Sequence, residues 1–161
     1  MQHTSRPKNT TKQNETTFYR VHGTSTIILM IPTTEAIAKE DLCRTILQQQ
    51  LEIRNFIEQH DAFNMSLRRF DNPFESAEDI SGCFFGVKGW PIDYDHLTCG
   101  MVANLLQGLW EYLYREQRFH GVMFEVIDDV WGAVGVGKVS LTRVSGSGMS
   151  ERLGAGNVTD A

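Results

Sequence analysis

The sequence predicts an α+β fold, a two-layer sandwich in which two long helices pack on one face of a mostly antiparallel or mixed sheet. Two stretches carry apolar residues at helical spacing, residues 33–60 and 93–117. Each lies between stretches rich in β-branched and aromatic residues, which favour strands. The expected order of elements is β-α-β-β-α-β-β. The second half ends in an apparent hairpin, which makes a doubly wound parallel sheet the weaker alternative.

The bulk composition is typical of one globular domain. The chain has 161 residues, of which 41% are hydrophobic and 22% are charged. Its polar ends predict disordered tails at residues 1–16 and 146–161, around a single domain over residues 17–145. The net charge is −5 and no basic run occurs, so we expect no binding to nucleic acid or to an anionic membrane.

Two further features indicate a cytosolic protein. Residues 1–16 contain no apolar segment and do not resemble a signal peptide, and the longest apolar run, residues 27–31, is too short to span a bilayer. The cysteines, Cys43, Cys83 and Cys99, are an odd number at wide spacing. This pattern is typical of buried thiols in a reducing compartment rather than of a disulfide framework or a zinc site.

In the first half of the chain we expect a long bent strand or a hairpin over residues 17–31, ended by Pro32. Thr33 and Thr34 are candidate N-caps of the first helix. Opposite charges four residues apart mark the solvent side of that helix. Residues 65–70 are expected to form a short strand.

In the second half we expect strands over residues 82–90, 122–127 and 131–144, with the second helix between the first two. That helix has one apolar stripe, formed by Val102, Leu105, Leu106, Leu109 and Leu113. The polar residues fall on its opposite side, namely Asn104, Gln107, Glu111 and Arg115. Gly108 costs about 1 kcal/mol inside a helix, which suggests the close approach of another backbone.

One motif resembles a phosphate-binding loop but fails in detail. Residues 132–139 (GAVGVGKV) nearly match the pattern G-x-x-x-x-G-K-[ST], in which backbone amides hold phosphate at a helix N-terminus. Val139 occupies the position that requires a hydroxyl, and the residues that follow alternate as in a strand. We therefore interpret this stretch as a glycine-rich strand rather than a nucleotide site.

The acidic turn before the second helix holds the first set of candidate site residues. Asp93, Asp95 and His96 carry side chains suited to metal binding or proton transfer, and Tyr94 is a candidate pocket lid. Three ligands within four residues rarely point at one centre. The favoured alternative is therefore structural: Asp95 or Thr98 caps the helix, and Asp93 complements its positive end.

Glu125 is the other candidate catalytic residue. On the predicted strand it shares one face with Met123 and Ile127, while Val122, Phe124 and Val126 share the other. If helices cover the face of Glu125, burial favours the protonated carboxyl and makes it a candidate general acid or base. If that face is solvated, Glu125 is a surface residue among apolar neighbours, and we favour this second case.

The remaining residues define no catalytic set. Histidines at the ends of predicted elements are surface residues by default (His22, His60 and His120). Aromatic side chains are expected to line a hydrophobic pocket, to fill the core or to form the centre of a dimer interface, including Phe84, Phe85, Trp90, Trp110, Tyr112, Tyr114 and Trp131. No metal-ligand set and no cofactor-binding motif is identified, so we expect neither a metal nor a cofactor.

Four short runs carry a resemblance to known proteins. They are Leu97-Thr98-Cys99-Gly100, Gln107-Gly108-Leu109, Phe124-Glu125-Val126 and Val134-Gly135-Val136-Gly137. Together they resemble a pattern in small uncharacterised proteins of filamentous fungi. The resemblance implies a context in natural-product biosynthesis and favours a small-molecule role, but it implies no reaction.

Two functional hypotheses follow. The first is a small-molecule-binding protein, as a cofactor-free isomerase, cyclase or lyase that acts on an apolar metabolite in a biosynthetic pathway. The second is a non-catalytic interaction module or homo-oligomer subunit. A closed apolar pocket with an ionisable wall residue would favour the first hypothesis. A flat apolar patch on the open face of the sheet would favour the second.

Overall fold

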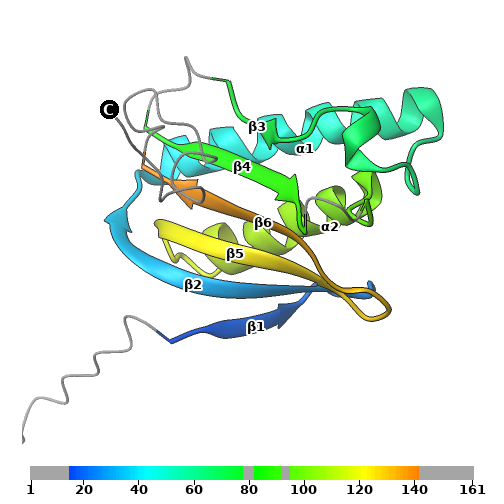
Figure 1. Cartoon of the computed structure of the whole chain (residues 1–161). Coiled ribbons are helices and arrows are strands. Elements are labelled where there is room, and N and C mark those ends of the chain that lie inside the picture. The colour runs from blue at the N-terminus through cyan, green and yellow to red at the C-terminus, as the bar shows by residue number, and fades with distance from the viewer. Residues whose placement is uncertain (1–14, 78–81, 92–94, 142–161) are drawn as a thin grey trace, which may run out of the picture.

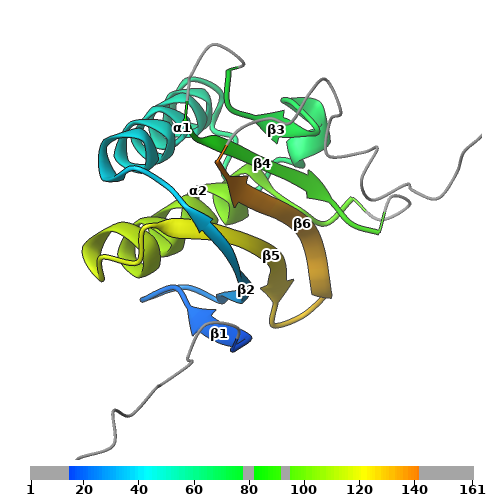
Figure 2. The same ribbon diagram turned by 90° about the vertical axis from the view of Figure 1, so that its left-hand side faces the viewer.

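The structure, a computed structural model, describes residues 15–77, 82–91 and 95–141. Six strands form one sheet in the order β1-β2-β5-β6-β4-β3, and every pair is antiparallel. Two helices, α1 and α2, lie on the same face of this sheet (Figure 1; Figure 2). The expected α+β class, with both helices on one face, is therefore confirmed, and a parallel sheet is excluded for the described strands.

The elements occur in the order β1, β2, α1, η1, β3, β4, α2, η2, β5, β6, which differs from the expected order in the first half. The strands are β1 (Thr17–Arg20), β2 (Thr26–Ala36), β3 (Phe74–Glu75), β4 (Phe84–Gly89), β5 (His120–Asp128) and β6 (Gly132–Ser140). The helical elements are α1 (Lys39–His60), the 3-10 helix η1 (Leu67–Arg69), α2 (Cys99–Leu109) and the π-helix η2 (Trp110–Arg115). The expected disordered tails fall almost entirely outside the described residues.

Of the two possibilities for residues 17–31, the chain forms the hairpin. Gly23 takes φ 74°, which suits glycine, and the amide of Val21 donates to the carbonyl of Thr26 at 3.0 Å. Strand β2 does not end at Pro32, as expected, but continues to Ala36. Pro32 has no N–H to donate, and the register between β2 and β5 shifts directly after it.

Two other expected features of the first half are wrong. Thr33 and Thr34 lie in β2 and cap no helix; α1 begins at Lys39 after Ala38, without a side-chain cap. Residues 65–70 form no strand; Leu67–Arg69 form the 3-10 helix η1, and Ser66 makes only an isolated bridge with Thr98. The hydroxyl of Ser66 accepts a hydrogen bond from the amide of Arg68, and such a local bond competes with strand pairing.

Helix α2 packs against the sheet through its predicted apolar stripe. Leu105, Leu106 and Leu109 are fully buried. Thr98, one of the two proposed caps, accepts a hydrogen bond from the amide of Met101 at 3.2 Å. Gly108 does allow a close approach, but of side chains rather than a backbone. A β-carbon there would lie 2.5 Å from Ile28 Cδ1 and 2.7 Å from Val21 Cγ2.

Three of the four polar residues opposite the apolar stripe form hydrogen bonds to other parts of the fold. Asn104 Nδ2 donates to the buried Thr26 hydroxyl at 3.2 Å. Gln107 Oε1 accepts from Gln50 of α1 at 3.3 Å and Glu111 accepts from the Tyr19 hydroxyl at 2.6 Å. These bonds join α2 and η2 to the hairpin and to α1, whereas Arg115, the fourth polar residue, is exposed.

The core lies between the helices and the sheet. It joins buried apolar residues of all layers, with ring contacts from Phe70 through Phe74 and Phe85 to Phe124.

Cys83 and Cys99 are buried thiols as expected, whereas Cys43 is partly exposed. Burial raises the pKa of the Cys83 thiol to about 11. Within the described part of the chain, no helix has both the length and the apolar character to cross a membrane.

Candidate functional site

The acidic turn before α2 is only partly described. Asp93 and Tyr94 lie outside the described residues. Asp95 accepts a hydrogen bond from the hydroxyl of Ser66. The ring of His96 stacks on Trp131, with the centroids 3.8 Å apart and the planes 9° from parallel. Both described side chains therefore contact neighbouring parts of the fold.

Glu125 lies on the face of the sheet that the helices leave open. Its neighbours across the strands are Leu29 of β2 and Val136 of β6, and it is partly buried. The buried residues of β5 point the other way, toward α1 and α2. The condition for a buried acid, a cover of helices over Glu125, is not met.

The candidate catalytic residues do not surround one cavity in the described structure. Glu125 lies in the middle of β5, whereas His96 contacts Trp131 in the turn beyond the end of that strand. Neither of the two cavities described below is lined by Glu125, Asp95 or His96. Within the described residues, no group of three histidine, cysteine or acidic side chains is placed to hold a metal. The glycine-rich stretch at residues 132–139 forms part of β6, as predicted.

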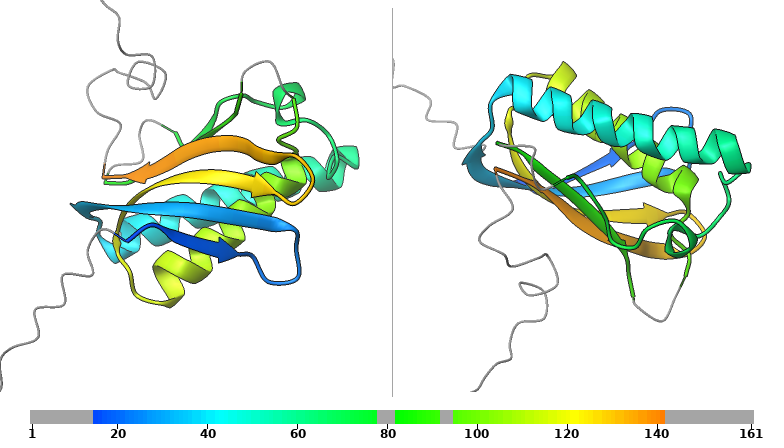
Figure 3. Two further views of the ribbon diagram at one scale, coloured as in Figure 1. Left: turned by 60° about the horizontal axis from the view of Figure 1, so that its bottom comes forward. Right: turned by 90° about the horizontal axis from the view of Figure 1, so that it is seen from above.

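The open face of the sheet carries apolar side chains in rows across the strands. One row runs from Phe18 through Leu29 and Glu125 to Val136, and the next contains Ile31 and Met123. Phe18 is 68% exposed, Ile31 46% and Met123 47%. Leu29 and Val136 are partly exposed. We call this surface the open sheet face; Figure 3 shows it as the side of the sheet away from both helices.

Charges of both signs lie on the open sheet face. Glu125 is surrounded by the apolar rows, and Lys138 lies opposite Met123 on the neighbouring strand. Lys88 lies opposite Val136, and Arg20 lies at the margin opposite Ile27. Arg20 forms an ion pair with Asp129 at 3.1 Å. Lys138 Nζ lies 5.6 Å from the ring centroid of Phe84.

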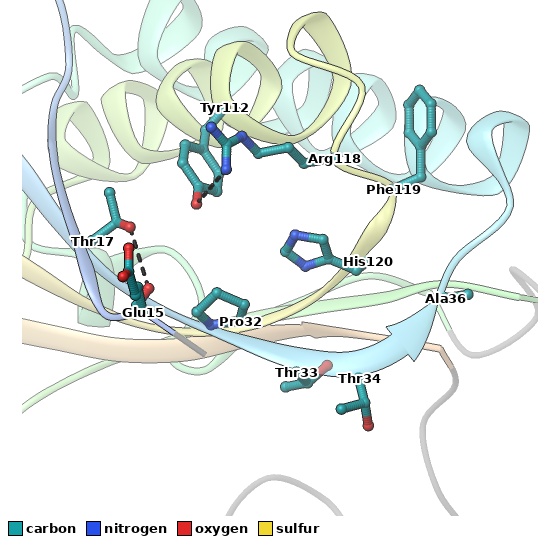
Figure 4. Close-up of a pocket in the computed structure, with 10 residues that line it drawn as sticks. All are labelled: Glu15, Thr17, Pro32, Thr33, Thr34, Ala36, Tyr112, Arg118, Phe119 and His120. Carbon is teal, nitrogen blue, oxygen red and sulfur yellow. Dashed lines mark hydrogen bonds between the residues drawn. The ribbon is translucent and has the colours of Figure 1, made fainter. Parts of the chain in front are cut away.

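A cavity of about 530 Å³ lies on the other side of β2, between that strand, η2 and the start of β5. Arg118, Tyr112 and His120 lie around one space, and Pro32 faces them across it (Figure 4). Arg118 Nη1 donates to the Tyr112 hydroxyl at 3.4 Å, and its guanidinium carbon lies 4.6 Å from the centroid of that ring. This cavity lies beside the register shift in β2.

A second cavity of about 400 Å³ lies between the β1–β2 turn, α1 and α2. Its wall includes Arg54, Asn104 and Gln107. These side chains already form hydrogen bonds within the fold: Arg54 donates to Gln107, and Asn104 donates to Thr26. Beside it, burial and the bond to Glu111 raise the pKa of Tyr19 to about 12. The same hydrogen bond lowers the pKa of Glu111. These shifts belong to a structural contact between β1 and η2.

The aromatic residues divide between the core, the wall of the first cavity and the exposed surface. Phe85 and Tyr112 are buried, and the ring of Tyr112 belongs to the wall of the first cavity. Trp90 and Trp131 remain exposed. Arg118 had no role in the sequence analysis, and His120 was expected to be a surface histidine. Their only signal is a short basic and aromatic run at the start of β5, a pattern too common to indicate a site.

No known protein family, no curated protein and no solved structure matches this chain.

Proposed function

We propose that the protein is an interaction module that self-associates through its open sheet face. The observation that carries this proposal is the exposure of Phe18, Ile31 and Met123 on three neighbouring strands of one face. Soluble monomers rarely leave large contiguous apolar patches in water, and such patches mark interaction sites. Of the two hypotheses, a flat apolar patch favours the interaction module.

The charges on this face favour a second copy of the chain as the partner. In a two-fold interface the same patch meets itself, so an acid on one copy requires a base on the other. The open sheet face supplies both, with Glu125 on β5 and Lys88 on β4, in the same row across the strands. A carboxylate among apolar side chains loses water when the face is covered, and a lysine of the second copy compensates for that loss.

The geometry of the sheet suits this arrangement. Two antiparallel sheets pack face to face at about 10 Å, with their strands about 30° apart, through interdigitating side chains. The rows from Phe18 to Val136 and from Ile31 to Lys138 provide such side chains over four adjacent strands. The alternative, catalysis by Glu125, Asp95 and His96, lacks a shared cavity among the described residues.

Sedimentation velocity of the full chain over a range of concentrations tests the proposal. We expect a reversible transition from monomer to dimer. Met123→Lys and Ile31→Lys should each weaken it at least about tenfold, because each places a charge where an apolar anchor is buried. Leu51→Lys is the matched control, because Leu51 is 63% exposed on α1, outside the open sheet face. A monomer at every concentration, or equal effects at Leu51 and Met123, would overturn the proposal.

A charge exchange between chains tests the second copy specifically. Glu125→Lys and Lys88→Glu should each weaken self-association, because each pairs like charges across the two-fold axis. An equimolar mixture of the two variants should associate again, because both cross-contacts then join opposite charges. A mixture that stays as monomeric as its components would exclude this arrangement of the two copies.

A further inference from the structure

We propose that the cavity between β2, η2 and the start of β5 binds a small organic anion, with its oxyanion against Arg118, Tyr112 and His120. The cavity lies on the opposite side of β2 from the open sheet face, so this inference does not depend on self-association. Its volume of about 530 Å³ falls in the range of about 300–1,000 Å³ that is typical of small-molecule sites. The register shift between Pro32 and Ala36 forms one wall, and such bulges are frequent beside binding sites.

Arg118 is the residue that selects an anion. Its Nε donates to Glu116 at 3.0 Å and its Nη1 to the Tyr112 hydroxyl at 3.4 Å. These bonds among described residues use Nε and Nη1, and Nη2 is left to donate to a ligand. The guanidinium is held over the Tyr112 ring, 4.6 Å from its centroid. A guanidinium positioned in this way binds carboxylate or phosphate with a small loss of side-chain freedom.

Tyr112 and His120 provide two further polar atoms. The Tyr112 hydroxyl accepts from Arg118, so its own proton is available to donate to an oxyanion. His120 Nδ1 lies 2.8 Å from the carbonyl oxygen of Gly121, which places a proton on Nδ1. Its Nε2 then accepts a hydrogen bond when the ring is neutral and donates one when the ring is protonated. Protonated His120 therefore adds a second positive charge beside Arg118.

The rest of the wall favours an organic body over a free ion. Pro32, Ala36 and the rings of Tyr112 and Phe119 supply apolar surface. Glu15 also lines the cavity, and in Figure 4 it lies beside Thr17, with Pro32 between it and His120. A carboxylate at that place repels a second negative charge on the ligand. The matching ligand is a small molecule with one anionic group on a compact apolar body.

Titration of the ¹⁵N-labelled full chain with four probes tests the inference by NMR. Benzoate and phenyl phosphate carry the two candidate oxyanions, benzamide is the uncharged analogue of benzoate, and inorganic phosphate lacks the apolar body. We expect saturable shifts of the amides of residues 118–121 with benzoate or phenyl phosphate. Benzamide and inorganic phosphate should each bind at least about tenfold more weakly. The tighter of the two aromatic anions identifies the oxyanion.

Variants assign the binding to the named residues. Arg118→Ala should weaken binding about tenfold or more, and Arg118→Lys should retain part of it. Arg44→Ala is the matched control, because Arg44 is as exposed as Arg118 and also pairs with a carboxylate. Glu15→Gln should have the opposite effect and strengthen binding, because it removes a negative charge from the wall of the cavity. Any of three outcomes would overturn the inference. Benzamide could bind as tightly as benzoate, Arg118→Ala and Arg44→Ala could have equal effects, or no probe could give a saturable shift.

Discussion

The two faces of the same sheet differ in what covers them, although their side chains are similar. On β2, the covered face carries Ile28 and Met30, and the open face carries Leu29 and Ile31. On β5 the covered face has Phe124 and Val126, whereas the open face has Met123, Glu125 and Ile127.

Hydrophobic residues on both faces of a strand usually indicate a sheet that is covered on both sides. Here one cover consists of α1 and α2, and no described element of the chain lies on the other face (Figure 3). The residue pattern of a strand therefore reports which faces prefer burial, but not whether the same chain buries them. Substitutions on the two faces test this difference.

The largest effect should come from adjacent residues of β2. Met30 is fully buried and Ile31 is 46% exposed. Met30→Ala should lower the free energy of unfolding by about 2–5 kcal/mol, because it empties a core position. Ile31→Ala should lower it by less than about 1 kcal/mol. Urea denaturation at low protein concentration measures both without a contribution from association. Equal losses would mean that the faces are assigned wrongly.

Gly108 tests how tightly the covered face is packed. Alanine gains about 1 kcal/mol in helix propensity there, but overpacking against buried side chains costs about 1–3 kcal/mol. The new methyl group would lie 2.5 Å from Ile28 Cδ1, and Ile28 is fully buried. Thermal denaturation should therefore show that Gly108→Ala is destabilising, by up to about 2 kcal/mol. Gly89→Ala is the control, because a β-carbon there meets its nearest atom at 3.9 Å.

The contact between Tyr19 and Glu111 should make stability depend on pH at both extremes. The pKa of Glu111 is lowered from the ordinary value of 4.5, so its stabilising effect is present above pH 4.5 and is lost as the pH falls through the lowered pKa. The pKa of Tyr19 is raised to about 12, so its effect is present below pH 10 and is lost as the pH rises toward 12. Urea denaturation across pH should show both losses in the wild type. Tyr19→Phe should remove the loss at high pH and reduce the loss at low pH, because Gln107 still donates to Glu111. If the substitution changed neither loss, the assignment would be wrong.

The smallest effect is expected at Arg20, the neighbour of Tyr19 on the other face of β1. Its ion pair with Asp129 is about half exposed at both partners, and exposed pairs contribute little. Arg20→Ala should leave the melting temperature unchanged within experimental error. If Arg20→Ala destabilised the protein as much as Tyr19→Phe, this margin of the open sheet face would be more ordered than its exposure suggests.

The class of the fold was predictable because it depends on patterns within single elements. The apolar stripe of α2, the alternation of β5 and the strand at residues 132–140 all follow from local spacing. The errors arose where one local signal opposed another. Pro32 normally ends a strand, but a bulge accommodates it within β2, and Ser66 favours a turn within an otherwise strand-like run.

The cavity was not predictable for a different reason. Arg118 precedes β5 and His120 is its first residue, but Pro32 and Tyr112 reach the same space from β2 and η2. Only the pairing of β2 with β5 brings these segments together, and a single sequence does not report that pairing. The contacts of Asn104 and Glu111 were not predictable for the same reason. Asn104 bonds to Thr26 and Glu111 bonds to Tyr19, and both partners lie on the β1–β2 hairpin, about 80 or more residues earlier in the chain.

The two edges of the sheet limit the kind of assembly that the chain can form. The edge strand β1 has 4 residues and the edge strand β3 has 2. β1 pairs only with residues 27–30 of β2, and Pro32 and the register shift interrupt the rest of that edge. Short or interrupted edges offer few free backbone groups to template the addition of further strands, which is how sheets grow into fibres. Contact between two open sheet faces, by contrast, buries the exposed apolar side chains of this face in both copies. Association through this sheet is therefore expected to stop at a closed pair, whatever the concentration of the protein.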